Sequence, residues 1–351
     1  MIQGRLGVIT LDRPKALNAL NLAMVEQLES ILADWAGNPA VHAVLIRSAS
    51  DRAFCAGGDV RSIGSLPDPA QREALGRAFF RTEYRVNYRI NTFPKPFIAL
   101  ISGINMGGGL GLSVHGSHRI VSETARMAMP ETVLGLFPDV GATWFLSRAP
   151  AYMGRYLALI GPTIGADDAM TAGLATHHVP AAKFDDLLTA LATAQRLDSD
   201  VVDRIVHERA TAAAAGSLAE RATDIAKLFA GPNLNSVIEG INEAAPRASW
   251  VGEAQSTLRR ACPTSLRATW QRMVDGVNHS IERVLTDDYR MAVRLVGRAD
   301  FAEGVRAILI DKDHSARWSP ATPARVSAAD IEALLAPIAE PDVLEGIERP
   351  D

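Results

Sequence analysis

The chain has 351 residues, so its length predicts either one large domain with an appended region or two domains. Hydrophobic residues make up 48% and charged residues 22% of the sequence, which is typical of a soluble globular protein. The formal net charge of -4 excludes the strongly basic surface of nucleic-acid-binding proteins, and two cysteines are too few for a disulfide framework.

The first half of the chain alternates strand-like and helix-like segments. Apolar side chains recur every three or four positions over residues 22–35, which predicts an amphipathic helix, and residues 69–91 predict another. Continuous apolar or β-branched runs bounded by proline, glycine or charge predict strands buried on both faces at 7–11, 41–48, 96–103 and 118–123.

From about residue 190 onward the strand pattern fades. Alanine-rich and charged segments there predict one helix after another. We therefore expect an α/β core over residues 1–190, an α-helical region over 191–338, and a polar tail over 339–351. Because no low-complexity linker separates the first two parts, they are expected to pack together.

Two glycine clusters, FCAGGDVRSIG and INMGGGLGL, stand where a predicted strand ends and a helix begins. Glycine permits close approach to the backbone, and a helix N-terminus offers unpaired N–H groups. Two such N–H groups converging from separate loops form an oxyanion hole. Tight turns with close helix–strand packing are the structural alternative, and the clusters alone leave both interpretations open.

Other glycine-loop chemistry has no support in the sequence. The chain contains neither GxxxxGK[ST] nor a GxGxxG that opens a βαβ unit, so neither a P-loop nor a dinucleotide-binding site is predicted. GLSVHG is not a GxSxG nucleophile elbow, because His115 stands where the last glycine belongs. His177 and His178 lack a spaced partner, so no metal site is predicted.

The segments FCAGGD, MGGGLGLS and AMPETVLGLFPDVG together resemble the crotonase (enoyl-CoA hydratase/isomerase) superfamily. Within it, the similarity is greatest to the 3-hydroxyisobutyryl-CoA hydrolase subfamily, through ITLDRPKALNAL, FRTEY, GLSVHG, GLFPDVGATWFL, CPTSL and EGVRAILIDKD. The resemblance implies a spiral of ββα turns with a C-terminal α-helical region. It also implies a bound acyl-CoA thioester and an oxyanion hole made by the amides of Gly58 and Gly108.

Carboxylates around the hole distinguish the reactions of the superfamily. The hydratases that this chain resembles use two glutamates, and the corresponding positions here are Gly111 and Glu131. Water addition, which needs two carboxylates to move two protons, therefore lacks one of them.

Three acids match the hydrolase pattern. Glu131 is expected to be the principal base or the nucleophile, with Asp139 as its partner, and Glu83 to hydrogen-bond the substrate or position the site. The residues do not decide between direct attack by Glu131 and activation of water. Taken singly, Glu131 and Asp139 also fit helix-start residues, and Glu83 fits a solvated helix face.

The resemblance also implies contacts to the coenzyme A part of the substrate. Arg13 and Lys15 are candidates for its phosphates, and a solvated surface role is their alternative. The glycine loops supply the remaining predicted substrate-binding residues, which are Ala56, Gly57, Asp59, Gly107 and Gly109. No cofactor is expected, because coenzyme A enters as part of the substrate.

Three functions follow, in order of preference. The first is hydrolysis of a short-chain 3-hydroxyacyl-CoA, of the 3-hydroxyisobutyryl-CoA type that serves valine breakdown. The second is an enoyl-CoA hydratase or isomerase, and the third is a non-catalytic acyl-CoA-binding protein.

The sequence also yields expectations about location and partners. No signal peptide or run of about 20 apolar residues is present, so a cytoplasmic protein without membrane or nucleic-acid partners is expected. Superfamily members commonly form trimers or hexamers. The resemblance thus allows a homo-oligomer, but the long helical region could cover the core instead, and the sequence leaves the oligomeric state open.

Overall fold

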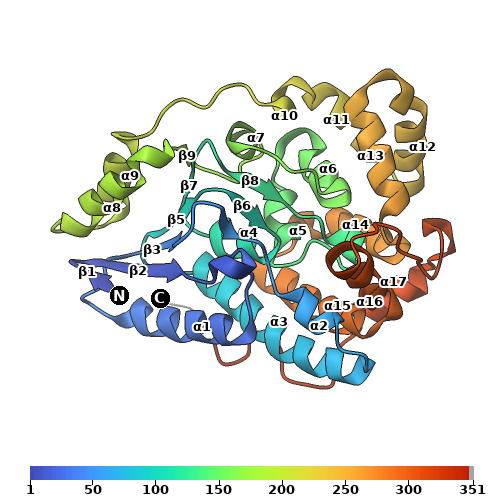
Figure 1. The fold of residues 1–351 in the computed structure, drawn as a ribbon, viewed down its shortest axis with the longest axis horizontal. Helices are drawn as coiled ribbons and strands as arrows, with labels where there is room; N and C mark the ends of the chain where they lie inside the picture. Colours follow the sequence, from blue (N-terminus) through green and yellow to red (C-terminus); the bar gives the residue numbers. More distant parts are fainter. Residues whose placement is uncertain (348–351) are drawn as a thin grey trace.

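The computed structural model describes residues 1–347, in which nine strands form two sheets (Figure 1). The larger sheet has the order β1-β2-β3-β5-β7-β9, and all its neighbouring pairs are parallel except β1 with β2. Its strands are β1 (Ile2–Gln3), β2 (Leu6–Leu11), β3 (Ala43–Ser48), β5 (Phe97–Ile101), β7 (His118–Val121) and β9 (His177–His178). The four predicted strands are therefore confirmed as β2, β3, β5 and β7.

A smaller parallel sheet, which the sequence analysis missed, consists of β4 (Ala53–Cys55), β6 (Ile104–Met106) and β8 (Arg126–Ala128). Each turn of the chain contributes one strand to the larger sheet, one to the smaller sheet, and then a helix. The three helices are α2 (Val60–Gly64), α4 (Gly108–Ser113) and the 3₁₀ helix η2 (Glu131–Leu134). This repeat is the expected ββα spiral.

The smaller sheet corrects the predicted position of the glycine clusters. Their glycines follow β4 and β6, whereas the sequence pattern predicts them directly after the strands observed as β3 and β5. Strands of three residues are too short to show a hydrophobic period, so only their pairing in the folded chain identifies them.

Helices cover both faces of the larger sheet. Along β5, Ala99 and Ile101 pack in the cluster shared with α1 (Leu22–Gly37) and α3 (Pro69–Asn91). Ile98 and Leu100 pack in a second cluster with α8 (Phe184–Thr193) and α9 (Ser199–His207). Burial of both faces explains why the strands read as continuous apolar runs.

Both predicted helices of the first half are confirmed, with caps that account for their starts. Asn21 precedes α1, and its side chain accepts a hydrogen bond from the Met24 N–H at 3.0 Å. Asp68 caps α3 in the same way, and Pro69 occupies a first-turn position where no N–H is needed. At 23 residues, α3 extends for about 34 Å and reaches from the sheet into the helical region.

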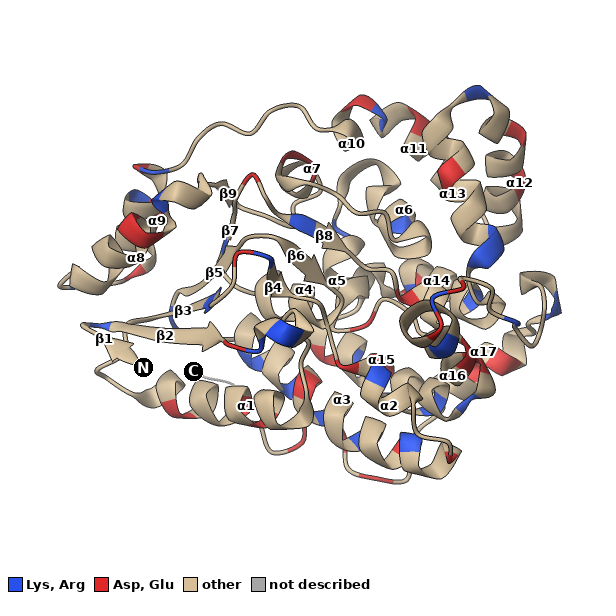
Figure 2. Cartoon of the chain, viewed as in Figure 1, with Lys and Arg blue, Asp and Glu red and all other residues tan. Residues whose placement is uncertain are grey.

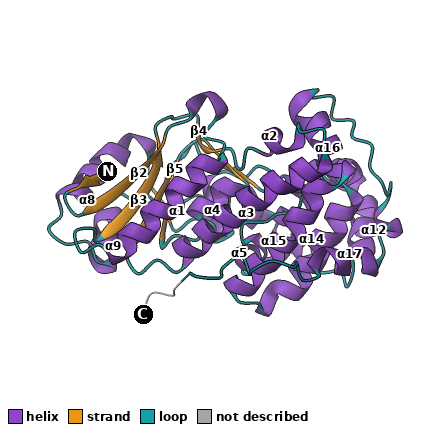
Figure 3. Cartoon of the chain, turned by 90° about the horizontal axis from the view of Figure 1, so that it is seen from below, coloured by secondary structure: helices purple, strands orange, loops and turns teal. Residues whose placement is uncertain are grey.

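The rest of the chain is helical and packs on the same core as α1 and α3. Figure 3 shows the strands gathered at one end of the molecule and the late helices at the other. The remaining α-helices are α5 (Ala142–Leu146), α6 (Met153–Ile160), α7 (Ala166–Thr171), α10 (Ser217–Glu220), α11 (Ala222–Phe229), α12 (Leu234–Ala244), α13 (Ser249–Arg260), α14 (Pro263–Asp275), α15 (Ile281–Gly297), α16 (Ala299–Val305) and α17 (Ala328–Leu335). Short 3₁₀ helices are η1 (Pro14–Ala16), η3 (Pro150–Tyr152), η4 (Ala181–Lys183), η5 (Ala245–Arg247), η6 (Gly276–Asn278) and η8 (Pro323–Arg325), and η7 (Arg306–Ile310) is π-helical.

The predicted domain limits stay predictions. Residue 190 lies within α8, which packs on the sheet, so the chain does not leave the sheet at that point. In the predicted polar tail, Val343 is buried and Glu340 pairs with Arg77 at 2.7 Å. Residues 348–351 of that tail lie outside the described residues.

Surface composition agrees with the mixed charge of the sequence. Acidic and basic residues are interspersed over the outer helices (Figure 2). In residues 1–347, no helix has the length and apolar character that crossing a membrane requires. The absence of a nucleic-acid partner and the oligomeric state stay predictions.

Candidate active site

Two glycine-rich loops meet at the end of the smaller sheet. Residues 56–58 follow β4, and residues 107–109 follow β6, the strand that pairs with β4. An ideal Cβ on Gly108 would lie 3.1 Å from the Gly58 nitrogen, and one on Gly57 would lie 3.4 Å from the Gly108 nitrogen. The structure therefore brings the two predicted donor amides together.

The two amides are available to a ligand. Neither the Gly58 N–H nor the Gly108 N–H donates a hydrogen bond to any group in the described part of the chain. The preceding residues are anchored, because the Gly57 carbonyl accepts from the Leu20 N–H at 2.8 Å and the Gly107 N–H donates to a β8 carbonyl at 3.2 Å. Two adjacent, unpaired N–H groups on anchored loops suit an oxyanion.

Glycine is required in these loops for two reasons. Gly57 and Gly107 have φ angles of +97° and +49°, in the region that side chains disfavour. A Cβ on Gly109 would lie 2.5 Å from the Cys55 carbonyl oxygen. Side chains here would push the loops apart or fill the space between them.

Glu131 faces the second loop from the start of η2. Its side chain is buried, with 7% of the residue exposed. Its Oε1 atom would lie 2.6 Å from a Cβ on Gly107, and its Oε2 atom has no hydrogen-bond partner in residues 1–347. A buried carboxylate oxygen without a partner is costly, so this atom is available to a substrate or water.

Glu83 approaches the same loop from α3. A Cβ on Gly108 would overlap the Glu83 Oε1 atom, which has no hydrogen-bond partner within the described residues. Only 2% of Glu83 is exposed, so the alternative of a solvated helix face is wrong.

Asp139 completes the group of acids and is 8% exposed. The Tyr84 hydroxyl donates a hydrogen bond of 2.6 Å to its Oδ2 atom. Asp139 precedes a turn in which Val140 and Gly141 have φ angles of 50° and 80°. Its side chain bonds Tyr84 and does not cap α5, which has no side-chain cap.

Burial shifts the titration of all three acids. Burial raises the pKa of Glu83 well above its usual value, and the nearby charges of Asp139 and Glu131 raise it further. Burial and Asp139 likewise raise the pKa of Glu131. Burial raises the pKa of Asp139 to about 7, the Tyr84 hydrogen bond opposes this rise, and the Asp288 charge adds to it. The three acids therefore hold their protons to higher pH than ordinary carboxyl groups do, and the charge of one affects the titration of the others.

Three contributors to the site were missed by the sequence analysis. Tyr84 adjoins Glu83, and Asn87 lies one helical turn further along α3. Both polar atoms of Asn87 are buried without a partner in residues 1–347. The spacing of four between Glu83 and Asn87 was a usable signal for a shared helix face. Asp288 lies far away in the sequence, and no local pattern indicates it.

Two of the predicted coenzyme A contacts bind each other. The Arg13 guanidinium and the Asp59 carboxylate form an ion pair at 2.9 Å, and Asp59 also accepts from the Ser62 N–H at the start of α2. Lys15 is exposed on η1. η1 adjoins the first glycine loop, because the Ala56 N–H donates to the carbonyl of Leu17 at 2.9 Å.

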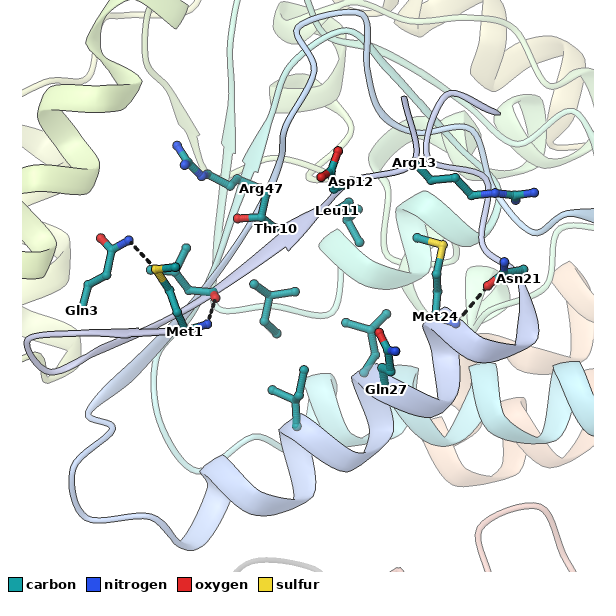
Figure 4. A pocket seen from close by; sticks show the side chains of 14 residues that line it. Met1, Gln3, Thr10, Leu11, Asp12, Arg13, Asn21, Met24, Gln27 and Arg47 are labelled. Carbon is teal, nitrogen blue, oxygen red and sulfur yellow. Dashed lines mark hydrogen bonds between the residues drawn. The ribbon is translucent and has the colours of Figure 1, made fainter. Parts of the chain in front are cut away.

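A cavity of about 830 Å³ opens between β2 and α1 (Figure 4). Polar side chains such as Thr10 and Gln27 and apolar ones such as Leu28 line it. Of the predicted site residues, only Arg13 reaches this cavity. It is separate from the three acids and both glycine loops.

The charged segment 311–314 follows η7 and is bound to the first residue of that helix. Arg306 pairs with Asp311 and Asp313, each at 2.7 Å. This segment is an anchored loop.

Comparison with known proteins gives a consistent family. A family model described as "Enoyl-CoA hydratase/isomerase" matches residues 6–335. The "3-hydroxyisobutyryl-CoA hydrolase, mitochondrial" of Xenopus tropicalis is 42% identical over 323 residues, which cover 90% of this chain and 83% of that protein. The Homo sapiens protein of the same name is 38% identical over 334 residues, covering 94% and 86%.

Solved structures share the fold. A carnitinyl-CoA dehydratase from Mycobacterium thermoresistibile superposes with a TM-score of 0.90 at 36% identity, covering 99% of this chain and 98% of that one. An enoyl-CoA hydratase from Rhodobacter sphaeroides 2.4.1 gives a TM-score of 0.87 at 41% identity, covering 96% of both chains. The expected crotonase fold is therefore confirmed. The names of these relatives specify different reactions, namely hydrolysis, dehydration and hydration.

Proposed function

The chain belongs to the enoyl-CoA hydratase/isomerase family, and on that premise we propose that it hydrolyses 3-hydroxyisobutyryl-CoA to 3-hydroxyisobutyrate and free coenzyme A. One observation supports this function best: two glycine amides that are unpaired within residues 1–347 lie beside the buried Glu131, while Gly111 offers no second carboxylate from α4. An oxyanion hole with one adjacent base suits thioester hydrolysis.

In the proposed reaction the thioester carbonyl oxygen accepts hydrogen bonds from the Gly58 and Gly108 N–H groups. An oxygen atom, from Glu131 itself or from water that Glu131 deprotonates, adds to the carbonyl carbon. The carbon–sulfur bond then breaks, and coenzyme A leaves as a thiolate that takes up a proton. If Glu131 attacks directly, water afterwards hydrolyses the resulting anhydride.

The other two acids have supporting roles in this proposal. Asp139, oriented by Tyr84, holds the water or shares a proton with Glu131. Glu83, which is buried beside Gly108, accepts a hydrogen bond from the substrate hydroxyl. The pKa of Asp139, raised to about 7 mainly by burial, suits proton exchange near neutral pH, and burial also raises the pKa of Glu83.

The coenzyme A moiety is proposed to follow the first glycine loop. Lys15 is exposed on η1, next to Ala56, and is the better candidate for a phosphate contact. Arg13 is bound to Asp59, so its role is to hold the loop. A cytoplasmic location stays a prediction, since the relatives above carry the word mitochondrial in their names.

A direct assay tests the function. Purified protein is offered 3-hydroxyisobutyryl-CoA while free thiol is followed, and then crotonyl-CoA while the enoyl-thioester absorbance is followed. We expect thiol release from the first substrate and no loss of absorbance with the second. Loss of enoyl absorbance without thiol release would establish a hydratase, and binding without either signal would leave a non-catalytic acyl-CoA-binding protein.

Gly111→Glu is expected not to create an efficient hydratase. A Cβ at residue 111 would lie 2.7 Å from Asn87 Nδ2 and 2.8 Å from Val140 Cβ, so a glutamate side chain has no room. Overpacking should lower stability by about 1–3 kcal/mol. Thermal melting measures the loss of stability, and an assay with crotonyl-CoA measures hydration. Efficient hydration would show that the missing carboxylate was the only barrier.

A further inference from the structure

The turn that carries Asp139 is strained. Val140 has a φ of 50°, which is rare for a β-branched residue, and Gly141 follows with a φ of 80°. Such conformations persist only where surrounding contacts hold them, and they gather at functional sites.

Each residue of this turn is held by a side chain from another part of the fold. Asp139 accepts from the Tyr84 hydroxyl at 2.6 Å. The Val140 carbonyl lies 2.8 Å from the His115 Nε2 atom, which donates to it. The Gly141 N–H donates to Asp288 Oδ2 at 2.9 Å, and that carboxylate comes from α15 in the helical region.

Asp288 is itself fixed by a buried charge network. Arg272, on α14, contacts Asp288 Oδ1 at 3.0 Å and Asp287 Oδ2 at 2.9 Å, and it donates to the Val284 carbonyl at 3.0 Å. Arg272 is 3% exposed and Asp288 is fully buried. A buried ion pair is a weak source of stability compared with apolar packing, whereas it can fix a geometry.

We propose that Asp288 is a positioning residue for the hydrolysis, because its bond to the Gly141 N–H fixes the strained turn that carries Asp139 beside Glu131. This inference rests on the proposed function. It gives the C-terminal helical region a part in the reaction, since both Asp288 and its partner Arg272 come from that region.

Asp288 also acts on Asp139 by charge. The groups that interact with Asp139 by charge or hydrogen bond are Glu83 and Tyr84 from α3, Glu131 from η2 and Asp288 from α15. Arg272 from α14 binds Asp288 on its other oxygen. His115 contacts the neighbouring Val140 carbonyl, and burial lowers its pKa to about 4, which keeps it neutral. Among them, the Asp288 charge raises the pKa of Asp139. Loss of the Asp288 charge should therefore lower the pKa of Asp139, whether the reaction uses the protonated or the ionised form of Asp139.

Asp288→Asn is the primary test, because an asparagine oxygen can still accept from the Gly141 N–H while the charge is removed. We expect the near-neutral limb of the kcat/KM profile for thiol release to move to lower pH by roughly half a unit or more, with kcat within about tenfold of the wild type. Asp288→Ala removes the acceptor as well, and its kcat should fall by roughly 10- to 100-fold with KM nearly unchanged.

Asp287→Asn is the matched control, because Asp287 binds the same arginine from the same helix and, among the described residues, forms no hydrogen bond with the turn. Its pH limb should stay in place. Wild-type kcat in Asp288→Ala, or a loss of kcat in Asp288→Asn as large as that in Asp288→Ala, would overturn the proposal, because the two variants differ in the acceptor for the Gly141 N–H. If Asp288→Ala fails to fold, a loss of kcat of more than about tenfold in Asp288→Asn would overturn it. An equal shift of the pH limb in Asp287→Asn would show that the Asp288 charge has no special effect on Asp139. Absence of thiol release by the wild type would instead refute the proposed function.

Discussion

Glu131→Gln is expected to lower the rate of thiol release from 3-hydroxyisobutyryl-CoA by about 10³-fold, within the range for loss of a general base. The amide keeps the size of the side chain but can neither take a proton nor act as the nucleophile. Glu131 is buried beside Gly107, and one of its carboxylate oxygens has no hydrogen-bond partner within residues 1–347. We therefore expect no other described group to take over its role in the reaction. Steady-state kinetics at pH 8 measures the effect.

The same substitution should leave stability unchanged or increase it. Burial raises the pKa of Glu131, so the folded state binds its proton more tightly than the unfolded state. The stability that this tighter proton binding contributes is fully present below pH 4.5, the ordinary pKa of a glutamate, and is lost as the pH rises. The difference in melting temperature between the variant and the wild type should therefore grow in favour of the variant from pH 5 to pH 8.

Glu26→Gln is the control, because Glu26 lies on the exposed face of α1. It should change neither the rate nor the pH dependence of melting. Near-normal thiol release by Glu131→Gln would contradict the role proposed for Glu131.

Gly108→Ala is expected to lower kcat by about 10²- to 10³-fold, comparable with the loss of one oxyanion donor. The added methyl carbon would lie 3.1 Å from the Gly58 nitrogen, at the distance where a thioester oxygen should accept its hydrogen bond. It would also overlap Glu83 Oε1 and displace that acid. Kinetics and melting of the purified variant separate lost activity from lost folding.

Gly252→Ala provides the comparison for a glycine substitution without a site effect. Gly252 lies inside α13, and a Cβ there meets only the Ala245 carbonyl oxygen at 3.7 Å. Activity should be unchanged, and stability should rise by up to about 1 kcal/mol because alanine favours the helix. Equal activity in Gly108→Ala and Gly252→Ala would show that the two loops do not form the oxyanion hole.

The acids of the site illustrate how far local sequence carries a prediction. Glu131 and Asp139 were found through a resemblance in which they lie eight residues apart, and their burial agrees with the expected site. Tyr84 was overlooked although it adjoins Glu83, because a tyrosine in a helix is more often part of the core than a partner of a carboxylate. Its 2.6 Å bond to Asp139 depends on how α3 packs against the turn.

The sequence by itself determined the long strands, helices α1 and α3, and the family, because hydrophobic period, capping residues and glycine clusters are local properties. Only the tertiary structure decided the smaller sheet, the approach of the two glycine loops and the contact between Gly141 and Asp288, which are 147 residues apart. Three-residue strands have no period to detect. A hydrogen bond between distant residues depends on the packing of whole helices, which no short segment encodes.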